Sequence, residues 1–311
     1  MRFVWQITIC TAAVACLSAV SVYAQVKVDP EGPSAAGWKT SVGYQMTGVR
    51  YSASLSRYRV FEKGVSIDVE HARYGGISGG SSSSRVSYNN GQPGLDQDNI
   101  SIGGRVYQFV SSGGRITYRL DGLRATSNDP TQLTDNVYAL APKIGYLNLA
   151  GTAYYDFGFV RTNYPGALEV KQYAPTLGFA LNDSRDWVQF RPLFIRISDS
   201  TRALDKGSTS GLNVSWTHFY GGAGGWMPVS TFAGGFVGNK VYAVDPEGGS
   251  IGNLGNVQRS ALTLGASWKY MGVLDFSLFA GTGNVDEPGL VAGTTHGYKS
   301  RFVNLSLSAS F

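Results

Sequence analysis

Two carboxylates, Asp68 and Glu70, stand two residues apart in a segment that alternates between polar and apolar side chains. In a strand, such residues point to the same face, with side chains about 6–7 Å apart. A pair at that spacing could serve as a general acid and base or hold a cation weakly. Charged walls balanced by arginines use the same pattern far more often, and we favour that interpretation.

The three histidines, His71, His218 and His296, are the other candidates for catalysis. His71 and His218 share parity with the apolar face of alternating segments, and His296 lies in a Gly/Thr loop. None has sequence neighbours that resemble a nucleophile–base–acid triad. Both cysteines, Cys10 and Cys16, fall within the first 24 residues, so the rest of the chain can form no disulfide or thiolate site. We therefore expect no enzyme, no cofactor and no metal site.

The elements that carry these residues alternate with a period of two, which is typical of half-buried strands. No stretch has a sustained helical period with caps. We predict an all-β fold, a transmembrane antiparallel up-and-down barrel of about 14 strands, with 12–16 acceptable. The predicted strands are residues 37–48, 50–61, 65–75, 98–110, 115–125, 137–147, 150–162, 168–181, 187–198, 209–219, 227–240, 260–271, 273–283 and 300–311.

The predicted connections alternate between short and long, as in bacterial barrels with short periplasmic turns and longer extracellular loops. The first connection, near 47–49, is short and breaks this rule, and the one at 163–167 is modest. The expected short turns are 62–64, 111–114, 148–149, 182–186, 220–226 and 271–272. The expected long loops are 77–99, 125–136, 198–208, 241–259 and 284–299. We predict that the Ser/Gly stretch 77–84 is part of a low-complexity loop.

Composition agrees with a barrel whose strands face lipid on one side and a polar lumen on the other. Charged residues are 15% of the chain, against about 25% in typical domains. Glycine and tyrosine number 41 and 18, and the mean hydropathy is −0.08. After the first 24 residues no apolar run approaches the about 20 residues of a membrane helix. The formal charge of +5 is mild and forms no runs, so we expect no nucleic-acid partner.

The charged face of each strand must point into the lumen, because an Arg or Lys facing the middle of a bilayer costs about 2–4 kcal/mol. A soluble sandwich would have the same periodicity with the apolar face inward, so periodicity alone leaves both readings open. For a barrel, the predicted pore-lining residues are Asp68, Glu70, Arg105, Arg115, Arg119, Asp121, Lys143, Asp156, Lys269 and Asp275.

The beginning of the chain looks like a secretory signal peptide. Arg2 supplies its positive start, an apolar stretch follows, and Val22 and Ala24 occupy the −3 and −1 positions of a cleavage site before Gln25. We predict a signal peptide over 1–24, cleaved near Ala24, a periplasmic lead-in over 25–36 and a barrel over 37–311. This prediction places the protein in the cell outer membrane.

The end of the chain alternates strictly and finishes on an aromatic residue. The apolar positions of this strand include Phe311, Ala309, Leu307 and Leu305, and serines occupy the positions between them. The strand resembles the C-terminal signal of Gram-negative outer-membrane β-barrels. The resemblance implies that the barrel assembly machinery reads these four residues, and that the protein contacts outer-membrane lipid and lipopolysaccharide.

Among fourteen-stranded barrel families the chain looks more like the monomeric porins than the fatty-acid transporters, which carry an N-terminal plug. This resemblance implies a channel for small polar solutes or ions. With the predicted lumen charges we expect a weak anion preference. Two alternatives remain open from the sequence. One is a structural, assembly or polysaccharide-export barrel that works with a periplasmic or secretion partner. The other is an outer-membrane lipid-modifying enzyme with a site near His71, His218 or His296.

Overall fold

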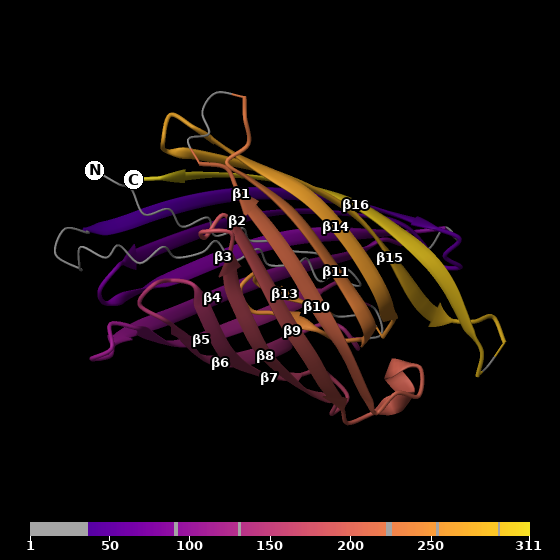
Figure 1. Ribbon diagram of the computed structural model, residues 1–311. Helices are drawn as coiled ribbons and strands as arrows, with labels where there is room; N and C mark the ends of the chain where they lie inside the picture. Colours follow the sequence, from indigo (N-terminus) through magenta and orange to yellow (C-terminus); the bar gives the residue numbers. More distant parts are fainter. Residues whose placement is uncertain (1–36, 90–92, 130–131, 222–225, 253–254, 292) are drawn as a thin grey trace.

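The described residues form one closed antiparallel barrel of fourteen strands (Figure 1). The computed structural model describes residues 37–311 except 90–92, 130–131, 222–225, 253–254 and 292. The predicted signal peptide and lead-in lie outside these residues. The predicted fold class is therefore confirmed, because the alternating segments pair in chain order and close into a barrel.

The strands of the barrel are long and follow the chain in sequence. They are β1 (Trp38–Ser52), β2 (Arg57–His71), β3 (Gly75–Tyr88), β4 (Leu95–Phe109), β5 (Arg115–Ser127), β6 (Val137–Leu147), β7 (Ala153–Asn163), β8 (Glu169–Leu181), β9 (Asp186–Ile197), β10 (Ser208–Phe219), β11 (Ser230–Lys240), β14 (Val257–Tyr270), β15 (Leu274–Pro288) and β16 (Thr295–Ser310). A two-residue hairpin pair, β12 (Val244–Asp245) and β13 (Ser250–Ile251), lies between β11 and β14 and stands outside the barrel sheet.

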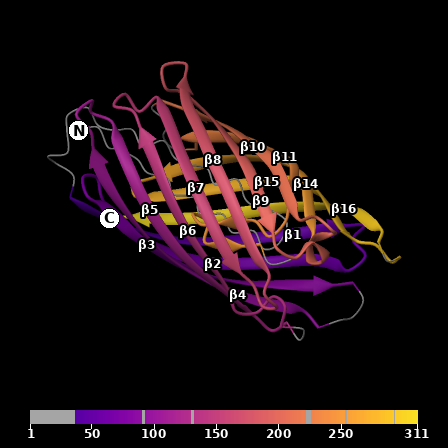
Figure 2. The ribbon, with the colours of Figure 1, turned by 90° about the horizontal axis from the view of Figure 1, so that it is seen from below.

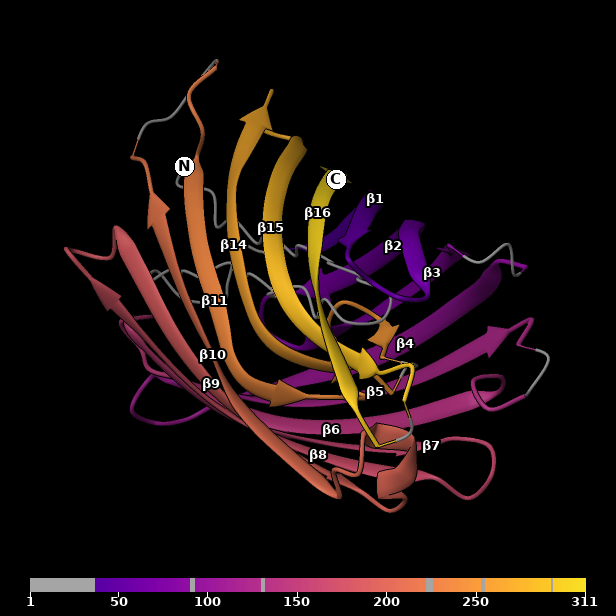
Figure 3. The ribbon, with the colours of Figure 1, turned by 90° about the vertical axis from the view of Figure 1, so that its right-hand side faces the viewer.

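Pairing of the last strand with the first closes the barrel. β16 runs antiparallel to β1 from Ser41 opposite Ser310 to Ser52 opposite Lys299. Beyond it, the backbones of Phe311 and Thr40 exchange two hydrogen bonds of 2.9 and 3.1 Å. The strands tilt and curve around a common interior (Figures 2 and 3). We call the end where β1 begins and β16 finishes the termini end, and the opposite end the loop end.

Side chains alternate between the interior and the outer wall along the strands. In β1, Val49 and Tyr51 are buried inside, whereas Val42 and Tyr44 are exposed on the outer wall. The outer wall carries a broad band of exposed apolar residues, which in a soluble sandwich would have been covered. The interior includes many buried polar and charged residues. This distribution is the one expected of a transmembrane barrel.

The predicted connections near 47–49 and at 62–64 and the predicted long loop 77–99 are wrong in place. Residues 62–64 lie inside β2, and the turns lie instead at 53–56 and 72–74. The Ser/Gly stretch 77–84, expected in a loop, forms most of β3 and pairs along its length with β2 and β4. Serine and glycine occupy both faces of this strand, so it has no apolar alternation to read, and its neighbours decide its conformation.

The remaining predicted short turns all coincide with connections at the termini end, which are 110–114, 148–152, 182–185, 220–229 and 271–273. One short 3₁₀ helix, η1 (Ser200–Ala203), lies between β9 and β10 at the loop end. Within the described part of the chain, no helix is long and apolar enough to cross a membrane.

Candidate functional site

The connection between β11 and β14 spans residues 241–256, and its described residues, 241–252 and 255–256, turn into the barrel instead of standing out from it. The side chains of Val244 and Ile251 on its hairpin are 5% and 1% exposed. They belong to one buried apolar cluster with interior residues of β5 to β9, among them Leu193 and Ile195. The hairpin therefore covers an apolar patch on the inner wall, in the half of the barrel nearer the loop end.

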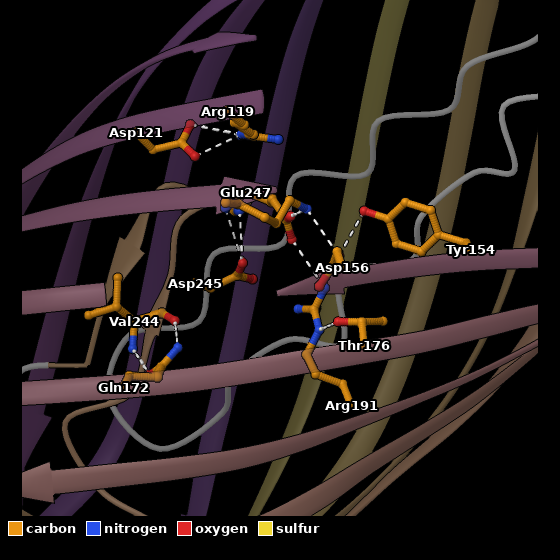
Figure 4. Close-up of polar contacts among 12 residues, drawn as sticks. Arg119, Asp121, Tyr154, Asp156, Gln172, Thr176, Arg191, Val244, Asp245 and Glu247 are labelled. Carbon is orange, nitrogen blue, oxygen red and sulfur yellow. Dashed lines mark hydrogen bonds and ion pairs between the residues drawn. The ribbon is translucent and has the colours of Figure 1, made fainter. Parts of the chain in front are cut away.

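Specific hydrogen bonds hold this hairpin against the wall (Figure 4). The side chain of Gln172 on β8 donates to the Val244 carbonyl at 2.9 Å and accepts from the Val244 amide at 3.0 Å. Gln172 thus satisfies the backbone amide and carbonyl of Val244, which a neighbouring strand would bond in a larger sheet. The Tyr164 hydroxyl donates to the Gly252 carbonyl at 2.7 Å.

The turn of the hairpin contains residues that favour a tight reversal of the chain direction next to the inner wall of the barrel. Asp245 accepts from the amides of Glu247 and Gly248 at 3.2 and 3.1 Å, which closes an Asx-type turn. Gly249 has a φ of +66°, and a Cβ there would lie 2.7 Å from the Ser101 hydroxyl on β4. Glycine is therefore required at this position both by conformation and by space.

Glu247 at the hairpin tip meets two cations of the barrel wall. Its carboxylate forms an ion pair with Lys143 on β6 and another with Arg191 on β9, the latter at 3.5 Å. Lys143 also lies 3.4 Å from Asp156, which accepts from the Tyr154 hydroxyl at 2.7 Å. Burial raises the pKa of the Glu247 carboxyl well above its ordinary value. These largely buried ion pairs hold the hairpin tip against the barrel wall.

A polar slot lies between the hairpin tip and the wall formed by β1 to β5, β15 and β16. Its hydroxyl lining comes from Ser41, Ser66, Ser78, Ser82, Ser101, Ser277, Ser306, Ser308 and Ser310. Asp68, Arg105, Arg119, Asp121 and Asp275 supply its charges, and Glu247 reaches it from the tip. Small hydroxyl side chains leave room and offer both donors and acceptors. The slot therefore presents a polar, hydrogen-bonding surface.

A second, smaller cavity lies on the other side of the tip, against β6 to β10. Lys143, Asp156 and Arg191 line it together with apolar residues such as Leu193. The hairpin thus divides the interior into a hydroxyl-rich side and a mixed side.

All ten predicted pore-lining residues lie on interior-facing positions of their strands, and most are joined in ion pairs. Arg105 is 2.8 Å from Asp68 and 3.0 Å from Glu70. The other pairs are Arg119 with Asp121 at 2.7 Å, Lys143 with Asp156 at 3.4 Å and Lys269 with Asp275 at 3.1 Å. The guanidinium of Arg115 stacks over the Tyr107 ring at 4.1 Å.

Sequence reasoning missed two residues of this charge network, Arg191 and Glu247. Arg191 lies on β9, whose alternation is poor because Pro192 and Phe194 follow it. Nothing in the sequence around Glu247 distinguishes an inward-folded loop from an exposed one. The ion pairs also argue against the acid–base role considered for Asp68 and Glu70, because both carboxylates contact Arg105.

The histidines lie apart from one another. His71 packs at the termini end between the rings of Trp38 and Tyr74, at centroid distances of 5.3 and 4.5 Å. His218 Nδ1 is 2.8 Å from Asp186, a contact that the sequence did not suggest. His296 Nε2 lies 2.6 Å from a backbone carbonyl in the β1–β2 turn. In the described ranges, no three His, Asp or Glu side chains gather as a metal site would require.

Docking of the hairpin should depend on Ile251. Because its side chain is almost fully buried, Ile251→Ala should weaken docking by about 2–5 kcal/mol through lost contact and cavity formation. We expect faster protease cleavage within 241–256 of the folded barrel. The matched control is Leu290→Ala in the next loop, where the side chain is 89% exposed and cleavage should not change. Equal cleavage of both variants and wild type would contradict the docked hairpin.

Comparisons with known proteins agree with the fold and assign no family. No protein-family model matches the chain, and no curated protein matches it. The structure is similar to that of the CymD monoaromatic hydrocarbon channel, with a TM-score of 0.56, 11% identity and coverage of 88% of each chain. It is also similar to the TodX deltaS2S3 mutant monoaromatic hydrocarbon channel, with a TM-score of 0.51, 9% identity and coverage of 90% of this chain and 91% of that one. The chain thus has the fold of outer-membrane β-barrel channels.

Proposed function

We propose that this protein is an outer-membrane channel for small polar solutes, narrowed by the inward hairpin 241–256. The observation that carries the proposal is the slot of serine hydroxyls and paired charges beside the hairpin tip. Barrels of eight strands are filled by their own side chains, and barrels of sixteen or more leave an aqueous channel. Fourteen strands with an inserted hairpin suit a narrow bore.

The solute class follows from what the interior offers. The two similar structures are named as channels for monoaromatic hydrocarbons. In this chain the hairpin covers much of the apolar inner wall, so a solute in the slot meets hydroxyl groups and ion pairs instead. The predicted weak anion preference belongs to this proposal. Because the wall charges are paired, selectivity should arise from small local imbalances rather than a large field.

Planar-bilayer recording of the refolded protein tests the proposal. Wild type should give discrete conductance steps. Arg119→Glu should shift selectivity toward cations, because Arg119 lies in the slot and its loss leaves Asp121 unpaired. Glu169→Gln on the outer wall is the control and should leave the reversal potential unchanged. Absence of steps from protein that migrates as a folded barrel would refute the channel and favour a barrel that needs a partner.

A further inference from the structure

Three arginines form a row on the outer wall near the loop end. Arg50 on β1 lies directly opposite Arg59 on β2 and directly opposite Arg301 on β16. Adjacent strands are about 4.8 Å apart, so the three α-carbons fall within about 10 Å. All three residues are exposed, whereas their chain neighbours Val49, Val60 and Phe302 are buried inside. The row therefore faces the surroundings of the barrel.

The height of this row matches the headgroup level of a membrane. At the termini end, Trp38, His71 and Tyr74 form an aromatic cluster of the kind found at membrane interfaces. Arg59 lies twelve residues before His71 on the same strand, β2. At about 3.3 Å per residue and a tilt of 35–45°, this spans about 30 Å along the membrane normal, and the apolar band of such barrels is about 25 Å tall. The row thus lies just beyond that band.

No carboxylate of the described residues forms an ion pair with Arg50, Arg59 or Arg301. Three other cations of the outer wall are paired, which provides an internal comparison. The pairs are Arg85 with Asp96 at 3.1 Å, Arg259 with Asp286 at 3.2 Å and Arg161 with Glu169. Like charges directly opposite each other in a sheet are destabilising. The row is therefore arranged for an anion that the chain itself does not supply.

The residues around the row suit a phosphorylated lipid. Lys299 lies two residues from Arg301 on the same face and is also exposed. Below the row, Gly48 leaves a gap without a side chain between the exposed residues Phe61 and Val303, which are its partners on β2 and β16. Arginine binds phosphate with paired, charge-assisted hydrogen bonds. An apolar notch beneath these cations could receive an acyl chain.

From this geometry we propose that Arg50, Arg59 and Arg301 form a binding site for the phosphates of a lipopolysaccharide-type glycolipid in the outward leaflet. The proposal depends on the outer-membrane placement proposed above and not on conductance. A glycolipid with two phosphates on a compact sugar headgroup matches a row of several cations better than a phospholipid with one phosphate does.

Native mass spectrometry of delipidated, refolded barrel tests this site. The probe is bisphosphorylated lipid A, compared with its dephosphorylated form and with phosphatidylglycerol. The triple variant Arg50→Gln, Arg59→Gln, Arg301→Gln should bind lipid A at least about ten-fold more weakly than wild type, since several charge-assisted contacts are lost. The matched control replaces the paired cations Arg85, Arg161 and Arg259 with glutamine and should retain wild-type binding.

Equal loss in the row and control variants, or equal affinity of wild type for phosphatidylglycerol and lipid A, would overturn the proposal. Competition by inorganic phosphate as effective as by lipid A would overturn it too. If the triple variant does not refold, the single variant Arg50→Gln at the centre of the row takes its place. Conductance of the variants is recorded in parallel. A row variant that conducts like wild type but loses lipid A separates this site from the channel.

Discussion

Replacing the hairpin residues 244–251 with a short Gly-Ser linker should raise single-channel conductance at least about two-fold, because the hairpin occupies interior space that a fourteen-stranded wall would otherwise leave open. The hairpin lies within the barrel and separates the hydroxyl-rich slot from the cavity against β6 to β10. Its removal should join these two spaces. The expected result is larger steps in the bilayer recording and faster uptake of bulky polar solutes into liposomes.

The control for this experiment is a loop change outside the interior. Substituting serine for Leu290 and Val291, which are 89% and 67% exposed, alters the next loop without touching the slot. Conductance of that variant should equal that of wild type. If removing the hairpin leaves conductance unchanged while the barrel stays folded, then the hairpin does not set the width of the path. Steps seen only after removal would instead identify the hairpin as a plug.

Glu247→Gln should make the channel more anion-selective at a pH where the Glu247 carboxyl of wild type is ionised. The carboxylate of Glu247 offsets Lys143 and Arg191, so its loss leaves an excess of positive charge at the tip. A permeating ion in the water of the slot, about 4 Å from this side chain, changes in energy by about 1 kcal/mol when one unit charge is removed. That energy corresponds to a roughly five-fold change in permeability ratio. The reversal potential in a salt gradient measures this change, with Glu169→Gln as the control of identical chemistry on the outer wall.

The same carboxyl makes the selectivity of wild type depend on pH. Burial raises the pKa of Glu247, so it accepts a proton at a higher pH than an ordinary glutamate. Above that pKa the group is negative and offsets the two cations. As pH falls through it, the group becomes neutral and wild type should approach the anion selectivity of Glu247→Gln. A pH response that persists unchanged in the variant would assign the titration to another group.

The period-two pattern of the sequence was enough to predict the barrel and the interior position of the ten charged residues. The count of fourteen strands agrees although the predicted strand 50–61 spans the turn between β1 and β2, and β3 was not predicted. Alternation is a local property, and lipid outside and water inside impose it on each strand separately. Asp121 and Lys143 could thus be placed on the interior face without knowledge of their partners. Residues 77–84 show the limit of this reading, because serine and glycine suit either face and only pairing with β2 and β4 makes them a strand.

The pairing register between strands, which no single segment reveals, determined which side chains meet across strands. It brings Arg105 beside Asp68 and Glu70, and it aligns Arg50, Arg59 and Arg301 from three strands into one row. The sequence alone therefore indicated which face of each regularly alternating strand points to the interior. Only the tertiary structure decided which charges meet and that the connection between β11 and β14 folds inward. That connection docks because the barrel presents an apolar inner wall and Gln172 at matching positions, and these contacts form between segments far apart in the chain.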